Sequence, residues 1–556
     1  MAKHIITSIL ILVLCFSNGY SQPKDQQYKK QNRDRIAEIE DGETQEAIVH
    51  FKQYLAEYPE DLESMYGLSV AYTNKGEIGN AMKYVKMAVE HGLPVERFFA
   101  GPIALLEPLL ESDSFKKYIR GRYQRLLHGP MLGKVTSNSA AIWIRTARPS
   151  NVEIRVMRGK KQEVYGDRYT RELDSRIQVE EYTPPSPDWE RNYTGRSSLV
   201  DDRTVIVEIT NLEADTDYRY EVYVDGSKYF NTGSFSTFPE TGDALKLKVG
   251  FAGGAGYTPW NEHVWDTLNI HQLDAFFHMG DNVYIDHPEH PETQRYNYYR
   301  RQSRMEFRRF TSQLSNYAIW DDHDFTVNDG VGSPQTDDPA WKRKVWKVFK
   351  QQWINPSYGG GEEHPGIWFD VSIGDIDFFF LDGRYYREDP EEYGSPSMLG
   401  ETQKQWLKDH LFNSEATFKV IVTPVPMTKG TKLSHPEDTW DGFPEEREEL
   451  YSFIEDNQIE GILLLAADRH RSDAWKTKRT NGYDLYEFQS SKLTNWHTHP
   501  VMDGSLFGYN QKNSFGVVTF DTTKDDPQVS YAIYNIDNEL IHQITIYKSQ
   551  LVLSDF

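Results

Sequence analysis

The chain has 556 residues and a formal net charge of −23, with 61 Lys and Arg against 84 Asp and Glu. This length exceeds what one hydrophobic core can organise, so it predicts several domains. The acidic excess opposes attraction to a phosphate backbone, and we therefore expect no nucleic-acid partner.

Residues 1–21 have the pattern of a secretory signal peptide. Lys3 is followed by an apolar stretch over residues 5–16, and Gly19-Tyr-Ser21 is a small-x-small cleavage site. The stretch is too short for a membrane span, and no later stretch is apolar for long enough, so we expect a secreted or periplasmic protein without a membrane span. Cys15 is the only cysteine and lies in this segment, so the mature chain would lack disulfides and thiolates.

Residues 22–125 are expected to form helices similar to tetratricopeptide repeats. Ala47 and Ala81 are 34 residues apart, and Leu68, Tyr72 and Gly76 fall at matching positions between them. The match covers about one and a half repeats. Since fewer than three repeats are usually unstable alone, the segment is expected to pack on its neighbour. Two roles stay open: a groove that binds a protein partner, or a structural cap.

Residues 128–240 are expected to form a β-sandwich of the fibronectin or immunoglobulin type. Short alternating runs predict strands, namely AAIWIRT, NVEIRVM, TVIVEIT, YRYEVYV and GSFST. Leu212, before a turn, with Tyr218 and Tyr220 in the following strand, resembles a tyrosine corner, and Trp143 is the expected buried aromatic residue.

Residues 244–556 alternate apolar strand patterns with helices and charged loops, which predicts an α/β domain. Its apolar runs are LKLKVGFA, DAFFHMGD, YAIWDDHD, DIDFFFLD, FKVIVTP and GILLLAAD, and four of these six end in an acidic residue. Ligands of α/β sheets bind in loops at the C-terminal ends of the strands, so the pattern indicates a site there.

Three of these strand ends carry groups that could bind metal ions. The groups are Asp281 and Tyr284 in MGDNVYID, then Asp321, Asp322, His323 and Asn328 in WDDHDFTVND, and finally Asp468, His470 and Arg471 in AADRHRSD. Carboxylate, amide and imidazole donors suit Ca, Mg, Mn, Zn or Fe. Each motif is weak alone, but together, each after an apolar strand, they indicate a metal site.

In this order and spacing, GDNVY, WDDHDFTVND, FLDGRYYR and ADRHR resemble the metallophosphoesterase domain of the PhoD-like alkaline phosphatases. The β-sandwich that precedes them is similar to the N-terminal domain of that family. The resemblance covers about residues 128–556 and leaves the helical segment outside. It implies a metallophosphoesterase α/β sandwich as the catalytic domain.

The resemblance also implies two metal ions, calcium together with iron, zinc or manganese, and no organic cofactor. Asp281 would bridge them, with Tyr284 and His470 on the iron-like ion. The calcium-like ion would take Asn328, Asp468, and either Asp321 or Asp322.

The same resemblance gives roles to residues around the metals. Arg384 would bind the phosphate oxygens, and His323 would stabilise the transition state or protonate the leaving oxygen. Arg471 and His497 are weaker candidates for substrate contact. His497 and His499 could instead be replacement ligands or part of a surface loop.

The loop FAGGAGY departs from the family pattern. It lacks the features of a nucleotide-binding loop, and Gly254 stands where the family usually has an iron-binding cysteine, which puts the iron-like site in doubt. A backbone without a side chain there could approach bound phosphate closely. Ala467 replaces the usual glycine before the last motif.

We therefore expect an exported phosphatase or phosphodiesterase that uses hydroxide generated at a dinuclear metal site. Its substrate would be a phosphate ester, either a small molecule or a glycan- or lipid-linked group. One alternative is hydrolysis of another oxyanion ester, such as a sulfate ester. Another is a catalytically degenerate protein that binds a glycan or a partner.

Overall fold

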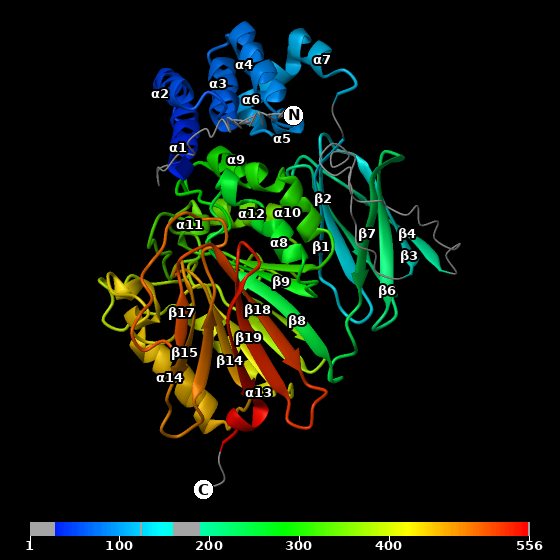
Figure 1. Cartoon of the computed structure of the whole chain (residues 1–556). Helices are drawn as coiled ribbons and strands as arrows, with labels where there is room; N and C mark the ends of the chain where they lie inside the picture. The colour runs from blue at the N-terminus through cyan, green and yellow to red at the C-terminus, as the bar shows by residue number, and fades with distance from the viewer. Residues whose placement is uncertain (1–27, 123–124, 160–188, 554–556) are drawn as a thin grey trace, which may run out of the picture.

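The computed structural model describes residues 28–122, 125–159 and 189–553, so the expected signal peptide and Cys15 lie outside the described residues. Figure 1 shows a helical region, two sheets beside it and a larger α/β region that follows. Within the described residues, no helix is long and apolar enough to cross a membrane.

Seven helices form the N-terminal region: α1 (Tyr28–Glu40), α2 (Thr44–Glu57), α3 (Leu62–Asn74), α4 (Ile78–Glu90), α5 (Glu96–Ala100), α6 (Ile103–Glu111) and α7 (Asp113–Ile119). Small residues such as Ala47, Ala81 and Ala88 are fully buried between them. Asp61 caps α3, since its side chain accepts a hydrogen bond from the backbone N–H of Ser64 at 2.8 Å.

The helical region packs on α9 (Pro291–Gln302) of the α/β region. Tyr296 of α9 belongs to the apolar core of the helical region and stacks on Tyr66 with 5.8 Å between ring centroids. The hydroxyl of Tyr296 donates to Glu63, which also forms a buried ion pair with Arg97 at 2.7 Å. A buried interface of this kind fits a structural cap.

The next region contains two antiparallel sheets. One has the order β1-β2-β5, from β1 (Leu126–Gly133), β2 (Ala140–Thr146) and β5 (Thr204–Ile209). The other has the order β4-β3-β6-β7, from β3 (Asn151–Arg158), β4 (Glu190–Arg196), β6 (Asp217–Val224) and β7 (Ser227–Ser236). All five predicted strands are strands in the structure.

Two aromatic residues fix these sheets to their surroundings. Tyr218 is buried, and its hydroxyl accepts a hydrogen bond from the backbone N–H of Glu213 at 2.9 Å. Trp143 is buried as predicted, but its indole N–H donates to the carbonyl oxygen of Gln351 in α12 (Lys342–Gln352). Trp143 therefore also ties the sheets to the α/β region.

The α/β region is built on two mixed sheets (Figure 1). The first has the order β10-β9-β8-β18-β19-β20, from β8 (Lys246–Ala252), β9 (Ala275–Met279), β10 (Ser315–Ile319), β18 (Ser514–Asp521), β19 (Gln528–Asn535) and β20 (Leu540–Tyr547). Its strands β8, β9 and β10 are parallel, and β18 adds to β8 antiparallel. The C-terminal strands thus extend this sheet.

The second sheet has the order β11-β12-β13-β14-β16-β15-β17, from β11 (Phe369–Ile373), β12 (Ile376–Phe380), β13 (Phe418–Val422), β14 (Ile462–Ala466), β15 (Ser472–Thr477), β16 (Leu485–Gln489) and β17 (Phe507–Tyr509). Aromatic rings fill the space between the two sheets. Phe277 of β9 lies 5.1 Å from Phe378 and 4.8 Å from Phe380 of β12, between ring centroids. The remaining helices are α8 (Val264–Asn269), α10 (Met305–Thr311), α11 (Asp322–Phe325), α13 (Gly400–Asn413) and α14 (Pro444–Asp456).

His278 of β9 is buried, and its Nε2 lies 3.1 Å from Oδ1 of Asn316. Burial lowers the pKa of His278 to about 3. The imidazole is therefore protonated below about pH 6.5 in the unfolded chain but stays neutral in the folded chain down to about pH 3. The stability of the folded state does not depend on His278 ionisation above pH 6.5 and decreases as the pH falls below that value.

We expect His278 to account for about 3 kcal/mol of the decrease in unfolding free energy between pH 7 and pH 4. Urea unfolding of His278→Gln should show a shallower pH dependence than the wild type. His435→Gln is the control, because this side chain is 73% exposed. Equal slopes for the wild type and His278→Gln would contradict the prediction.

Candidate metal centre

The predicted site residues come together where strands of both α/β sheets end. Asp281 follows β9, Asp322 follows β10, and His470 follows β14. The sheets meet nearby, since the backbone N–H of Gly253 after β8 donates to the carbonyl oxygen of Ser490 after β16 at 3.0 Å. The loops therefore converge on one volume, as expected for the C-terminal ends of parallel strands.

The turn after β9 is shaped by Gly280. Its φ is +90°, and a Cβ atom there would lie 2.6 Å from Cβ of Asp321. Only glycine allows this approach, and Asp281 follows it with a φ of 53°. The two strand-end loops are therefore in direct contact, which brings Asp281 and Asp321 into one cluster.

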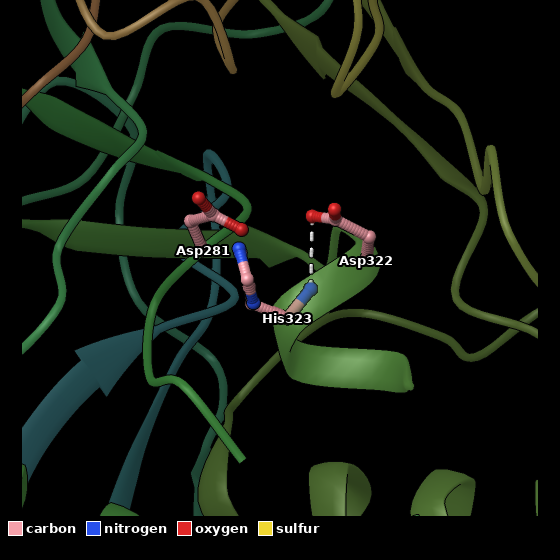
Figure 2. Close-up of side chains that lie close together, drawn as sticks. All are labelled: Asp281, Asp322 and His323. Carbon is pink, nitrogen blue, oxygen red and sulfur yellow. Dashed lines mark hydrogen bonds between the residues drawn. The ribbon is translucent and has the colours of Figure 1, made fainter. Parts of the chain in front are cut away.

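Asp281, Asp322 and His323 form a compact group of potential ligands (Figure 2). One ligand atom from each lies within 4.8 Å of the others, and all three side chains are buried. Oδ1 of Asp281 and Oδ2 of Asp321 have no hydrogen-bond partner among the described residues. Buried carboxylate oxygens without partners, beside an imidazole, are what a bound cation would satisfy.

The carboxylates repel one another. Burial and the neighbouring carboxylates of Asp322 and Asp321 raise the pKa of Asp281 well above its ordinary value. Burial also raises the pKa of Asp321 well above its ordinary value, although Arg384 acts in the opposite direction. Cations would remove this repulsion, so the residues present fit a metal centre.

Tyr284 and His470 also lie beside Asp281. The Tyr284 hydroxyl donates to Oδ2 of Asp281 at 2.5 Å, and Nε2 of His470 lies 3.8 Å from the same oxygen. The amide nitrogen of Asn495 donates to the Tyr284 hydroxyl and lies 3.5 Å from Nδ1 of His470. Asn495, after β16, thus holds both side chains beside Asp281.

Asp324 holds the two loops together. It accepts hydrogen bonds from the backbone N–H groups of Val283 at 2.9 Å and Asn282 at 3.1 Å. Burial raises its pKa to about 7 despite these bonds. Asp324 therefore fixes the position of the β9 turn against α11.

Arg384 lies beside Asp321 in the cluster. It is fully buried, with Nε donating to Oδ1 of Asp321 at 2.6 Å and NH1 donating to Oδ1 of Asp438 at 2.8 Å. Burial opposes ionisation of Asp438, but Arg384, Arg387 and Lys432 hold its pKa well below its ordinary value. Nε and Nη1 of the guanidinium thus bind carboxylates and position Asp321, whereas Nη2 has no hydrogen-bond partner among the described residues.

Three other predicted residues have distinct positions. Asp468 is half-buried and accepts a hydrogen bond from NH1 of Arg469 at 2.5 Å. Asn328 is exposed beyond α11. Arg471 is buried and donates to Asp473 at 2.5 Å and to the carbonyl oxygen of Thr431 at 2.9 Å. Arg471 is therefore engaged with neighbouring groups in the interior.

The predicted histidines lie beside His470. Ring centroids are 5.2 Å apart for His470 and His497, and 4.5 Å apart for His497 and His499. Gly254 is also adjacent, since a Cβ atom at this position would lie 3.3 Å from Nδ1 of His470. Gly254, which stands where the family usually has a cysteine, thus lies next to the candidate centre.

A side chain at residue 254 is expected to disturb the centre. Gly254 has a φ of +68°, and an added Cβ atom would also lie 2.9 Å from Oγ of Ser491. We expect Gly254→Ala to lower the unfolding free energy by at least about 1–2 kcal/mol, because of backbone strain and this contact. Gly76→Ala is the matched control, with a φ of +73° and no atom within 4 Å of the added Cβ. An equal loss in both variants, measured by urea unfolding, would show that the contact has no effect.

No role was predicted for Asn495, Asp324 or Asp438. Asp324 lies inside a quoted motif and follows Asp321 at capping-box spacing, a signal that could have indicated its structural role. Asn495 lies in a loop and Asp438 in the short 3-10 helix Pro436–Asp438. Neither follows an apolar strand, so their roles depend on the tertiary fold.

The catalytic-domain residues match a known family. The model of the PhoD-like phosphatase family matches residues 249–545, which contain every residue of this cluster. This chain belongs to the PhoD-like phosphatase family. A second model, for a domain of unknown function, matches residues 123–181. The helices α1–α7 lie outside both matches.

Known members and structures agree with the PhoD-like assignment. Alkaline phosphatase D of Bacillus subtilis (strain 168) is 24% identical over 339 residues, which is 52% of this chain and 56% of that protein. The match therefore spans little more than half the length of that relative.

Solved structures give the same fold. A structure of PhoD has a TM-score of 0.56 at 16% identity, over 74% of this chain and 91% of that chain. A purple acid phosphatase from yellow lupin (Lupinus luteus) has a TM-score of 0.51 at 11% identity, over 76% of this chain and 74% of that chain. These likenesses support an α/β phosphoesterase fold.

Proposed function

We propose that this chain hydrolyses phosphate esters with the help of bound cations. The observation that carries the proposal is the buried cluster of Asp281, Asp321 and Asp322, in which two carboxylate oxygens have no partner among the described residues. Membership of the PhoD-like phosphatase family supports phosphate esters as the substrate class. The relative in Bacillus subtilis is named an alkaline phosphatase.

The donor set suggests how two cations would be held. Asp281 would be shared, with Tyr284 and His470 binding one cation and Asp321 or Asp322 binding the other. Asp321 and Asp322 are both candidates for the second cation: Arg384 occupies Oδ1 of Asp321 but leaves its Oδ2 without a partner among the described residues, and both oxygens of Asp322 accept backbone hydrogen bonds. When bound, the cations would supply Lewis-acid activation of water and charge neutralisation at the phosphoryl group. Oxygen and nitrogen donors without a thiolate suit calcium with zinc, iron or manganese.

The protein groups would perform the remaining tasks. Arg384 keeps Asp321 in place, and Asn495 keeps Tyr284 and His470 beside Asp281. His323 has one ring nitrogen on Asp286 and would use the other toward Asp281, where Figure 2 shows a ring nitrogen facing that carboxylate. From there it would bind a cation or protonate the leaving oxygen.

One assay distinguishes the candidate activities. The purified protein would be chelated, supplied with Ca²⁺ together with Zn²⁺, Fe³⁺ or Mn²⁺, and tested on p-nitrophenyl phosphate, bis-p-nitrophenyl phosphate and p-nitrophenyl sulfate. Cation-dependent turnover of a phosphate ester supports the proposal. Turnover of only the sulfate ester would mean that the substrates are sulfate esters. No turnover of any ester by the folded protein would favour a binding role.

Three further proposals rest on sequence features. We propose export to the periplasm or medium on the basis of residues 1–21. We also propose that β1–β7 form a fibronectin-like sandwich, supported by the Tyr218 hydrogen bond, and that α2–α4 are tetratricopeptide-like. Binding of a protein partner by these helices is the alternative to their role as a structural cap.

A further inference from the structure

Helix α1 contacts the loop that follows the Asp281 motif. Asp34 lies 3.1 Å from His287 and Asp41 lies 2.9 Å from His290, between carboxylate oxygens and ring nitrogens. Glu40 accepts a hydrogen bond from the backbone N–H of Thr293 at 3.1 Å. In Figure 1, α1 reaches from the helical region to the side of α9. A helix outside the PhoD-like match is thus attached to a loop of the catalytic domain.

Arg33 is the innermost of these contacts. Its side chain is 3% exposed, and NH1 donates to the carbonyl oxygen of Tyr284 at 3.0 Å. The same nitrogen forms an ion pair with Oδ2 of Asp286 at 2.6 Å. The other oxygen of Asp286 contacts Nδ1 of His323. Arg33, Asp286 and His323 therefore form a continuous chain from α1 to the metal-centre residues.

The Asp286 contact determines which ring nitrogen of His323 is available. A carboxylate on Nδ1 fixes the orientation of an imidazole and leaves Nε2 for a cation or a substrate. Asp286 has a φ of 45° and lies in a segment with other acidic residues, so its side chain needs a contact that fixes its position and balances its charge. The buried guanidinium of Arg33 balances its charge and holds its second oxygen.

We propose that Arg33 is a positioning residue for the candidate metal centre: through Asp286 it orients His323. The helical region then completes the active site of this chain, in addition to packing on α9. The inference rests on the proposed function, and it assigns part of that function to a segment outside the family match.

Arg33→Ala is expected to lower kcat/KM for the phosphate ester that the wild type turns over by about 10–100-fold, the usual effect of removing a partner behind a ligand or catalytic side chain. Millimolar methylguanidinium should restore part of this activity and leave the wild type unchanged. Arg35→Ala is the matched control on the same helix, because Arg35 pairs with Glu38 at 2.8 Å within α1. Arg33→Ala within twofold of the wild type would overturn the inference.

A double-mutant cycle separates positioning from simple attachment of α1. If Arg33 acts through Asp286, then Arg33→Ala should add less than twofold to the loss caused by Asp286→Ala. Independent, multiplicative losses would mean that Arg33 only fastens the helix, and would overturn the inference.

A spectroscopic measurement keeps the inference apart from the proposed function. In protein labelled with ¹³Cε1-histidine, the His323 resonance, assigned with His323→Gln, should shift in Arg33→Ala and stay in place in Arg35→Ala. If the wild type hydrolysed no ester, the proposed function would fail, and this shift alone would decide the positioning role. An unchanged resonance in Arg33→Ala would overturn it.

Discussion

Asp281→Asn is expected to lower kcat/KM for phosphate ester hydrolysis on the order of 10³-fold, about 4 kcal/mol in the activation free energy. Asp281 is the carboxylate common to both groups of donors, since it contacts Tyr284 and lies close to His470, Asp322 and His323. An amide at this position keeps the shape but removes the charge that would hold two cations.

The same substitution should stabilise the protein when no cation is bound. Burial and the nearby carboxylates raise the pKa of Asp281, so its ionised form opposes folding above the ordinary pKa of an aspartate. The stability advantage of Asp281→Asn should therefore grow as the pH rises from 4 toward neutral. Urea unfolding with chelator measures this advantage, and saturating cations should reverse it in favour of the wild type.

Asp370→Asn is the control for Asp281→Asn, because Asp370 is 41% exposed and lies 3.4 Å from His410. It should change neither activity nor the pH dependence of unfolding. An Asp281→Asn variant with more than a tenth of the wild-type activity, or with lower stability in chelator, would contradict the assignment of Asp281.

Arg384→Met is the second substitution with a large expected effect. It leaves the buried carboxylates of Asp321 and Asp438 without their shared guanidinium, and breaking a buried ion pair from one side costs about 3–5 kcal/mol. We expect this loss in the unfolding free energy, together with a decrease in kcat/KM of about 10²-fold, because Asp321 would lose its fixed orientation.

Arg479→Met is the matched control, since Arg479 also pairs with two carboxylates, those of Glu448 and Glu455, both at 2.6 Å. It should lose stability without loss of kcat/KM per folded molecule. If the Arg384→Met variant kept the wild-type kcat/KM, Asp321 would have no part in the reaction. A large rise in KM alone would instead support the direct phosphate contact that the sequence predicts for Arg384.

The sequence allowed the strands and the location of the site to be predicted because both depend on local patterns. Apolar runs such as ILLLA form buried strands, and an acidic residue after such a run lies at the C-terminal edge of the sheet. The glycine before Asp281 is also explained locally, because the turn at Gly280 needs a positive φ.

The remaining features depend on contacts between distant segments. Asn495 lies 211 residues from Tyr284, and Arg33 lies 251 residues from the Tyr284 carbonyl group that it contacts. Neither residue stands in a pattern that indicates its partner. The ion pairs of Arg384 were also unpredictable, because Asp438 lies 54 residues away in a short 3-10 helix that only the folded chain brings beside Arg384.

The measurement that tests the central claim most directly is a cation titration of phosphate ester hydrolysis by the chelated wild-type protein. Activity is expected to be negligible at first and to rise to saturation as Ca²⁺ and a second cation, Zn²⁺, Fe³⁺ or Mn²⁺, are added, with elemental analysis showing about two bound ions per chain. Full activity in the chelated protein, or saturation with cations without any hydrolysis, would contradict it.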